Sequence, residues 1–64
     1  MSRSDTYPYE AILEVRGDRA LLVRIEGELF WLPTSVVGEY ADAKIGDTLT
    51  LHIPEWLCED RGIS

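Results

Sequence analysis

Two side chains in this 64-residue chain belong to the types that most often do covalent chemistry: the single histidine, His52, and the single cysteine, Cys58. A hydroxyl nucleophile needs a base beside it and a third group to orient that base, and here only His52 could be the histidine base. His52 lies on the polar side of an alternating segment, which predicts a solvent-facing strand position. Cys58 falls in a short predicted helix, where a small apolar role is favoured over a reactive thiol. We therefore expect no catalytic residue.

The sequence also has few residues that could form a metal or cofactor site. One cysteine and one histidine allow neither an internal disulfide nor a Cys/His zinc cluster. The five glycines are scattered singly, so no Gly-rich loop predicts a phosphate site. Adjacent acids such as Glu59 and Asp60 point about 100° apart on a helix, which is typical of a solvated face. We expect no metal and no cofactor, and we interpret the chain as something other than an enzyme.

The charge balance is acidic. Twelve Asp and Glu residues face six Lys and Arg residues, which gives a net charge of −6. Because phosphate contacts dominate nucleic-acid affinity, this balance disfavours nucleic acid as a partner. Arg16, Arg19 and Arg24 are close in sequence and are interpreted as solvated hairpin charges, with a local basic patch as the alternative. An acidic surface is complementary to a basic surface on a protein partner.

The elements that must position these residues are mostly strands. Residues 1–8 are predicted to be a flexible tail. Apolar and polar residues then alternate over 9–16, which predicts a strand with one buried side. That buried side should carry Tyr9, Ala11, Leu13 and Val15. Residues 20–25 are nearly all apolar, which suggests a central strand covered on both faces. Gly27 permits a tight hairpin into a third strand over 29–32, which Pro33 closes.

The second half of the chain holds one strand and one helix. Residues 33–41 are irregular, with room for a helical turn capped by Thr34 or Ser35. Alternation over residues 48–53 predicts a strand. Pro54 stops that strand and begins a predicted two-turn helix over 54–61, which ends at Gly62. The side chains expected to plug one end of the fold are Val36, Val37 and Tyr40.

This order of elements predicts a mainly β protein, a small SH3-like or OB-like antiparallel barrel of four or five strands with a short C-terminal helix. Parallel crossovers need a dozen or more residues each, and the chain has no room for them. We predict a single domain over residues 9–64. A domain of this size has a thin core, and 45% hydrophobic residues are enough to form it.

Aromatic residues are better candidates for function than the polar ones. Trp31, centred in its strand, is expected in the core, so its neighbour Phe30 should point outward because strand side chains alternate. Trp56 flanks the apolar side of the C-terminal helix, where it either covers the open end of the barrel or anchors a partner. The predicted partner-binding residues are two aromatics and four acids: Phe30, Trp56, Glu26, Glu28, Glu59 and Asp60.

Residues 20–33, residues 46–57 and the pair Gly62-Ile63 resemble a family of very small SH3-like barrel modules of bacterial and phage proteins. The most specific part is Ile53-Pro54-Glu55-Trp56-Leu57, and the similarity covers about residues 10–63. The resemblance implies an SH3-like barrel and brings no catalytic residues. The chain lacks the basic residue expected after Pro33, which counts against a nucleic-acid role. The phage association also suggests an acidic inhibitor of a host defence complex that mimics nucleic acid, as anti-CRISPR proteins do.

Three functions remain open. The leading hypothesis is a non-enzymatic binding module that docks onto a protein partner through its exposed aromatic and acidic residues. The first alternative is the acidic inhibitor, and the second is a nucleic-acid-binding barrel that uses Arg16, Arg19 and Arg24. An exposed edge strand could also pair two copies of the chain.

The N-terminus lacks the apolar run of a signal peptide. No stretch approaches the roughly 20 apolar residues of a membrane helix, and a lone thiol points to a reducing compartment. We therefore expect a cytoplasmic protein with no membrane partner.

Overall fold

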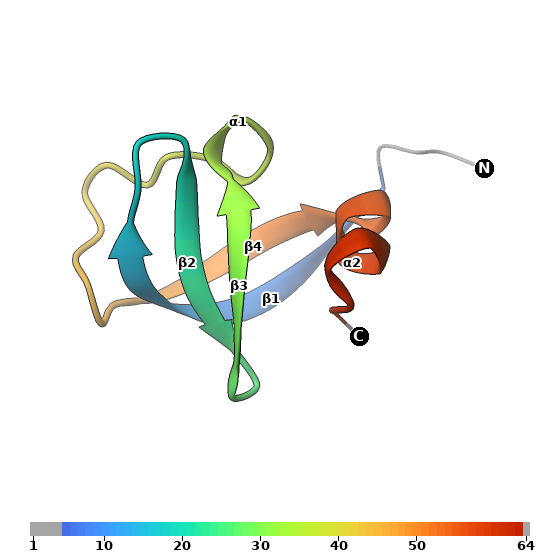
Figure 1. Ribbon diagram of the computed structural model, residues 1–64, viewed down its shortest axis with the longest axis horizontal. Helices are drawn as coiled ribbons and strands as arrows, with labels where there is room; N and C mark the ends of the chain where they lie inside the picture. The colour runs from blue at the N-terminus through green and yellow to red at the C-terminus, as the bar shows by residue number, and fades with distance from the viewer. Residues whose placement is uncertain (1–4, 64) are drawn as a thin grey trace.

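Strand β1 (Thr6–Arg16) is the longest element, and it pairs with a different neighbour in each half. The computed structural model describes residues 5–63 and shows a four-stranded antiparallel sheet in the order β3-β2-β1-β4 (Figure 1). The other strands are β2 (Ala20–Ile25), β3 (Glu28–Pro33) and β4 (Thr48–Pro54). Residues 6–12 of β1 pair with β4, and residues 12–16 pair with β2.

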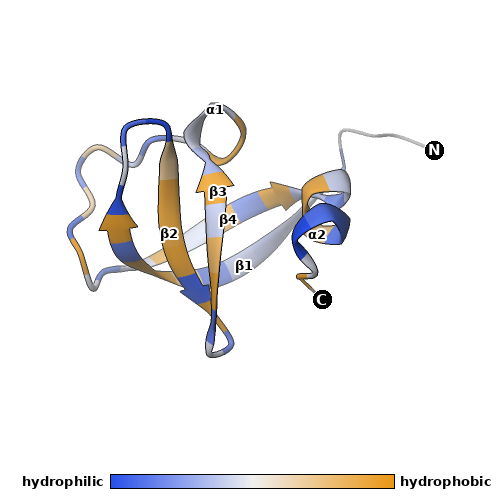
Figure 2. Ribbon diagram, viewed as in Figure 1, coloured by the Kyte–Doolittle hydropathy of each residue, from blue (hydrophilic) through white to orange (hydrophobic). Residues whose placement is uncertain are grey.

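The sheet is strongly curved, and as a consequence the β2–β3 hairpin crosses in front of β4 at a steep angle (Figure 1). The core lies on the inner side of this curve, where the two helices also contribute. Figure 2 shows that β2 and β3 carry the longest hydrophobic stretches. The buried core consists of Ala11, Leu13, Leu21, Val23, Ile25, Leu32, Val37, Leu51, Ile53, Leu57, Cys58 and Ile63. The prediction of a mainly β antiparallel fold is confirmed.

The predicted tail is shorter than expected, because β1 begins at Thr6. Residues 6–8 pair with residues 52–54 of β4. The Leu13 N–H donates to the Asp47 carbonyl, so the odd-numbered residues of β1 form the backbone hydrogen bonds to β4, and the backbone groups of the even-numbered residues point away from β4. Pro8 fits in this ladder because proline has no N–H, and none is needed at an even-numbered position. Residues 1–4 of the predicted tail lie outside the described residues.

The prediction for β3 was wrong about which aromatic residue is buried. Glu26 and Gly27 have φ angles of 51° and 85°, as a two-residue hairpin turn requires. This turn places Val23 opposite Phe30. Phe30 therefore shares the inner face with buried Val23 and packs against the core, whereas Trp31 lies on the outer face with 48% of its surface exposed.

Two further predictions about buried faces need correction. Strand β2 is central, yet only its inner face is covered: Leu21, Val23 and Ile25 are buried, while the residues between them are half-buried. Val15 of β1 is exposed rather than buried. A register shift between Leu13 and Val15 adds one residue to β1 there, which turns Val15 to the outer face. His52 is exposed as predicted.

Both helices are short. Helix α1 (Thr34–Val37) has Pro33 at its N-cap and no side-chain cap, so the predicted capping by Thr34 or Ser35 was wrong. Helix α2 (Glu55–Arg61) begins after Pro54 and ends at Gly62, whose φ of 76° is left-handed, as predicted. Within residues 5–63, no helix has the length and apolar character needed to cross a membrane.

On each of the two edge strands, β3 and β4, one backbone carbonyl at the free edge accepts a hydrogen bond from a side chain. On β3, Thr34 N–H donates to the Arg19 carbonyl, so Leu29 and Trp31 direct their backbone groups to the free edge. The Trp31 carbonyl accepts a 3.0 Å hydrogen bond from Arg61 Nε of α2. On β4, the Thr50 carbonyl accepts a 3.2 Å hydrogen bond from the Tyr40 hydroxyl. Within residues 5–63, β3 and β4 do not pair with each other.

Candidate functional site

Five apolar side chains lie together on the outer face of β1, β2 and β3, and we call them the outer-face patch: Ile12, Val15, Leu22, Leu29 and Trp31. Their contiguity follows from the strand register. Val15 is paired with Leu22, and Leu22 is paired with Trp31, which makes one row across three strands. Ile12 and Leu29 flank Arg24 in the next row. Directly opposed residues share a face and contact one another, so these side chains form one surface.

The outer-face patch is accessible to solvent. Ile12 is 38% exposed, Val15 44%, Trp31 48% and Leu29 50%, and Leu22 is half-buried between its neighbours. Single exposed apolar residues are common on proteins and need no explanation. Several large ones on adjacent strands are unusual, and such contiguous patches mark interaction surfaces. The patch is therefore the strongest candidate for a functional site.

The charged groups beside the patch are mostly acidic. Arg24 Nε donates to Glu14 Oε2 at 3.0 Å, and this ion pair lies in the row of Ile12 and Leu29. A hollow of about 360 Å3 adjoins that row. Its lining comes from β1, β2, β4 and the β2–β3 turn: Glu10, Ile12, Arg24, Glu26, Gly27 and Thr48. Both Glu10 and Glu26 are exposed there.

The predicted site residues form two groups. Glu26 and Glu28 are exposed at the β2–β3 turn, and together with half-buried Phe30 they line a small hollow of about 80 Å3 against Gly62 and Ile63. The structure thus brings these three residues together, although Phe30 contributes to the core rather than to an outward anchor.

The second group lies on α2. Trp56 is 49% exposed, and Glu59 and Asp60 are also exposed. Asp60 is ion-paired with Arg61, which in turn donates to the Trp31 carbonyl. Trp56 therefore does not act as a buried cover of the core, and it is available for contact.

The three arginines of the predicted basic alternative do not act together. Arg24 is paired with Glu14 on the outer face. Arg16 instead donates to three carbonyls of the loop between α1 and β4, those of Glu39, Tyr40 and Ala43, at 2.8, 2.8 and 2.6 Å. Two of the three guanidinium groups are thus committed to contacts within the chain.

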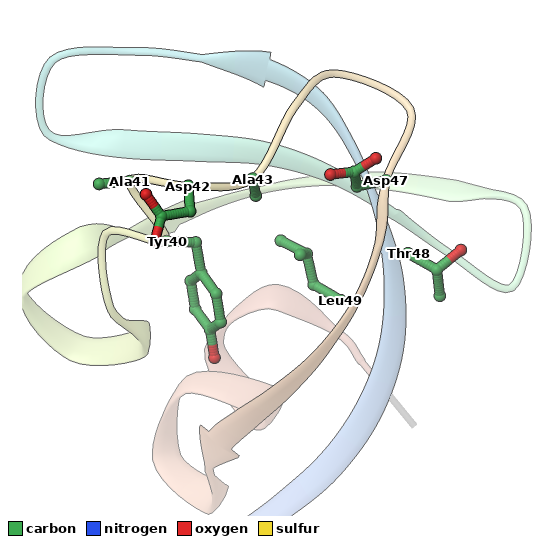
Figure 3. A pocket seen from close by; sticks show the side chains of 7 residues that line it. All are labelled: Tyr40, Ala41, Asp42, Ala43, Asp47, Thr48 and Leu49. Atoms are coloured by element: carbon green, nitrogen blue, oxygen red, sulfur yellow. The ribbon is translucent and has the colours of Figure 1, made fainter.

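A third hollow, of about 500 Å3, is open and lies between the α1–β4 loop and the start of β4 (Figure 3). The Tyr40 ring and Leu49 form its apolar part. Asp47 Oδ2 accepts a 2.9 Å hydrogen bond from the Lys44 N–H, which holds the loop in its turn. No histidine or cysteine lines this hollow, and the polar groups of its side chains are two carboxylates, one phenol and the Thr48 hydroxyl.

Cys58 is buried, and its Sγ lies 3.8 Å from the Tyr9 hydroxyl and 3.8 Å from the Ile53 carbonyl. The side-chain hydrogen bond with Cys58, followed by burial, raises the pKa of Tyr9 above its ordinary value. The burial of Cys58 within α2 confirms the apolar helical position predicted for it. Within residues 5–63, no cluster of three or more His, Cys, Asp or Glu residues could hold a metal ion.

Comparisons of the chain with protein-family models, with curated proteins and with solved structures find no match. The resemblance to small SH3-like modules therefore stays a prediction.

Sequence reasoning missed the outer-face patch because it placed Trp31 inside. A signal was present in Arg24. A charged residue in the middle of a strand indicates which face of that strand is solvated. A two-residue turn at Glu26-Gly27 then sets the pairing of β2 with β3: it places Leu29 opposite Arg24 and Trp31 opposite Leu22. The register of a hairpin therefore carried information that the composition of β3 alone did not.

Proposed function

We propose that this chain is a non-enzymatic module that binds a protein partner through its outer-face patch. The observation that supports this function is the in-register row of Val15, Leu22 and Trp31 on the solvent side of the sheet. Tryptophan is enriched at the energetic centres of interfaces, where neighbouring apolar side chains exclude water from it. Leu22 and Val15 occupy those neighbouring positions.

The patch lies outside the buried core of the fold. The strand residues of the core lie on the opposite face of the sheet, and half-exposed side chains bury a smaller fraction of their apolar surface than the fully buried core residues do. A small acidic chain that keeps such residues at its surface risks aggregation. A binding partner gives a physical reason for keeping them.

The arginine contacts favour a protein partner over nucleic acid. Arg16 donates to backbone carbonyls and Arg24 is paired with Glu14. Their register partners, Leu21 and Ile12, lie on opposite faces of the sheet, so the two arginines do not supply one phosphate-binding stripe. The inhibitor alternative, in which acidic side chains mimic nucleic acid, predicts binding that weakens steeply with salt. Binding centred on the outer-face patch predicts that most of the affinity remains at high salt, so one salt titration separates the two.

We further propose that the curved sheet is a small SH3-like barrel. Helix α1, the loop that follows it and helix α2 bridge the gap between β3 and β4, through Arg61 on one edge and Tyr40 on the other. Such closure by side chains replaces the strand pairing that would otherwise complete a barrel.

The test is capture of a partner from a lysate of the source cells, with matched tryptophan variants. Trp31 and Trp56 are almost equally exposed, at 48% and 49%, so Trp31→Ala and Trp56→Ala remove similar apolar areas from different faces. We expect a protein that the unaltered chain and Trp56→Ala retain and that Trp31→Ala loses. Loss with Trp56→Ala and retention with Trp31→Ala would place the site on α2 instead.

A further inference from the structure

We infer that the partner presents a basic side chain beside an apolar anchor, and that the basic side chain enters the hollow between Glu10 and Glu26. This inference rests on the proposed function, because the hollow adjoins the outer-face patch through Ile12. It specifies the chemistry of the partner's contact residues: an aromatic or aliphatic side chain for Trp31 and Leu22, and an arginine or lysine for the hollow.

The lining of the hollow fits the two parts of a long basic side chain. Ile12 supplies an apolar surface, on which the methylene stem of an arginine or lysine packs well. Glu10 and Glu26 supply carboxylates near its charged head. The volume of about 360 Å3 is open to solvent on the outer side of the sheet, so a partner's side chain can enter without opening the fold.

The local charge is complementary to a cation. The ionised groups in and beside the hollow are Glu10, Glu14, Arg24 and Glu26, that is, three negative charges and one positive, a net of −2. Arg24 does not cancel the attraction, because its guanidinium is already paired with Glu14 at 3.0 Å. An incoming cation would therefore meet two carboxylates, Glu10 and Glu26, for which the described contacts give no ion-pair partner.

The spacing of the two contacts limits the kind of segment that can make both. The Val15-Leu22-Trp31 row and the row of Arg24 are two residues apart along β2, or roughly 7 Å at the usual rise of a strand. Two side chains on one face of an extended segment have this spacing, as do side chains one helical turn apart. A second copy of this chain is a poor occupant, because two copies would each bring a net charge of −6.

The experiment is selection of peptides from a random displayed library on the full chain, with removal of those that also bind Trp31→Ala. We expect the enriched peptides to combine an apolar anchor with arginine or lysine two to four residues away. The double variant Glu10→Gln, Glu26→Gln should weaken their binding about tenfold, and it should lower the dependence of binding on salt. Replacing the peptide's basic residue by glutamine should weaken binding to the unaltered chain equally and leave no further effect of the double variant.

A matched control is the double variant Glu39→Gln, Glu59→Gln, which removes two exposed acids that lie outside the outer-face patch and the hollow and should leave peptide affinity within about twofold. Enriched peptides that lose binding with Trp31→Ala but carry no basic residue would overturn this inference and leave the proposed function standing. The same holds if the Glu10 and Glu26 variant binds them normally. A library that yields nothing dependent on Trp31 would overturn both.

Discussion

Leu22 of β2 lies directly opposite Trp31 of β3, and this pair fixes which side of the β2–β3 hairpin faces solvent. The position is a non-hydrogen-bonded one, at which the two backbones approach most closely and their side chains contact each other. Because Leu21 and Leu32 occupy the adjacent register on the inner face, the hairpin has a buried side and an apolar exposed side. The proposed function depends on the second of these.

The two leucines of β3 test the orientation of this strand. Leu32 is fully buried and Leu29 is half-exposed, although both belong to the same strand and have the same side chain. Leu32→Ala should lower the free energy of unfolding by about 2–5 kcal/mol, because it leaves a cavity in the core. Leu29→Ala should lower it by no more than about 1 kcal/mol. Urea unfolding of both variants makes the comparison, and equal losses would mean that β3 is oriented differently.

Much of the fold could be predicted from local patterns. Strict alternation fixed β4, and Pro54 and Gly62 marked the ends of α2. The orientation of β3 could not be found in this way, because Leu29-Phe30-Trp31-Leu32 is apolar throughout and gives no alternation. Its orientation depends on the hairpin turn and on β2, which is a tertiary constraint.

The extra residue in β1 is a second feature that local pattern does not contain. The alternation that starts at Tyr9 continues to Val15 in the sequence, yet the register shift after Leu13 turns Val15 outward. The need for that shift comes from pairing β1 with two different neighbours. As a result, Glu26 at the turn was identified, but none of the five patch residues was assigned to a binding surface. Val15 was expected on the buried side of its strand, and Trp31 was placed in the core.

Arg16 holds the loop between α1 and β4, and its removal should loosen that loop. Arg16→Ala removes three charge-assisted hydrogen bonds to the carbonyls of Glu39, Tyr40 and Ala43, including one on a residue with a left-handed φ of 50°, Tyr40. We expect amide hydrogen exchange over residues 38–47 to accelerate at least tenfold, with a loss of about 1–2 kcal/mol in global stability.

Two variants control for the loss of charge at Arg16. Arg16→Lys should restore little, because one ammonium group cannot match the geometry of a guanidinium that bonds three carbonyls. Arg19→Ala, at an exposed position three residues along the chain, should leave exchange in the loop unchanged. Unaltered exchange in Arg16→Ala would show that the loop is held by other contacts.

Arg61 joins the end of α2 to the edge of β3. Arg61→Ala removes its hydrogen bond to the Trp31 carbonyl and its ion pair with Asp60, so α2 should fray from its C-terminal end. We expect faster hydrogen exchange in α2 with a loss of no more than about 1 kcal/mol in global stability. Glu59→Ala, an exposed substitution in the same helix, is the control. Equal exchange in both variants would contradict a role for Arg61 in holding α2.

Stability should fall at alkaline pH in a way that depends on Tyr9. Its pKa is raised above 10.0 in the folded chain, first by the side-chain hydrogen bond with Cys58 and then by burial. The folded state therefore retains the phenolic proton where the unfolded state has lost it. This contribution is fully present below pH 10 and is lost as the pH rises through the folded pKa.

Tyr9→Phe should remove that part of the loss, so its urea midpoint should decline less between pH 9.5 and 11.5 than that of the unaltered chain. The pKa of Tyr7 is also raised, mainly by the negative charge of Glu55, so Tyr7→Phe should act in the same direction. Parallel pH curves for the unaltered chain and Tyr9→Phe would contradict the assignment.

The most direct test of the binding surface is a backbone amide NMR titration of the isotope-labelled chain with the captured partner. The outer-face patch predicts that the largest shift changes fall on residues 12, 15, 22, 29 and 31, with residues of α2 and of the loop at 40–47 changing little. Shift changes centred on Trp56 and the acids of α2, with none on β2 and β3, would contradict it.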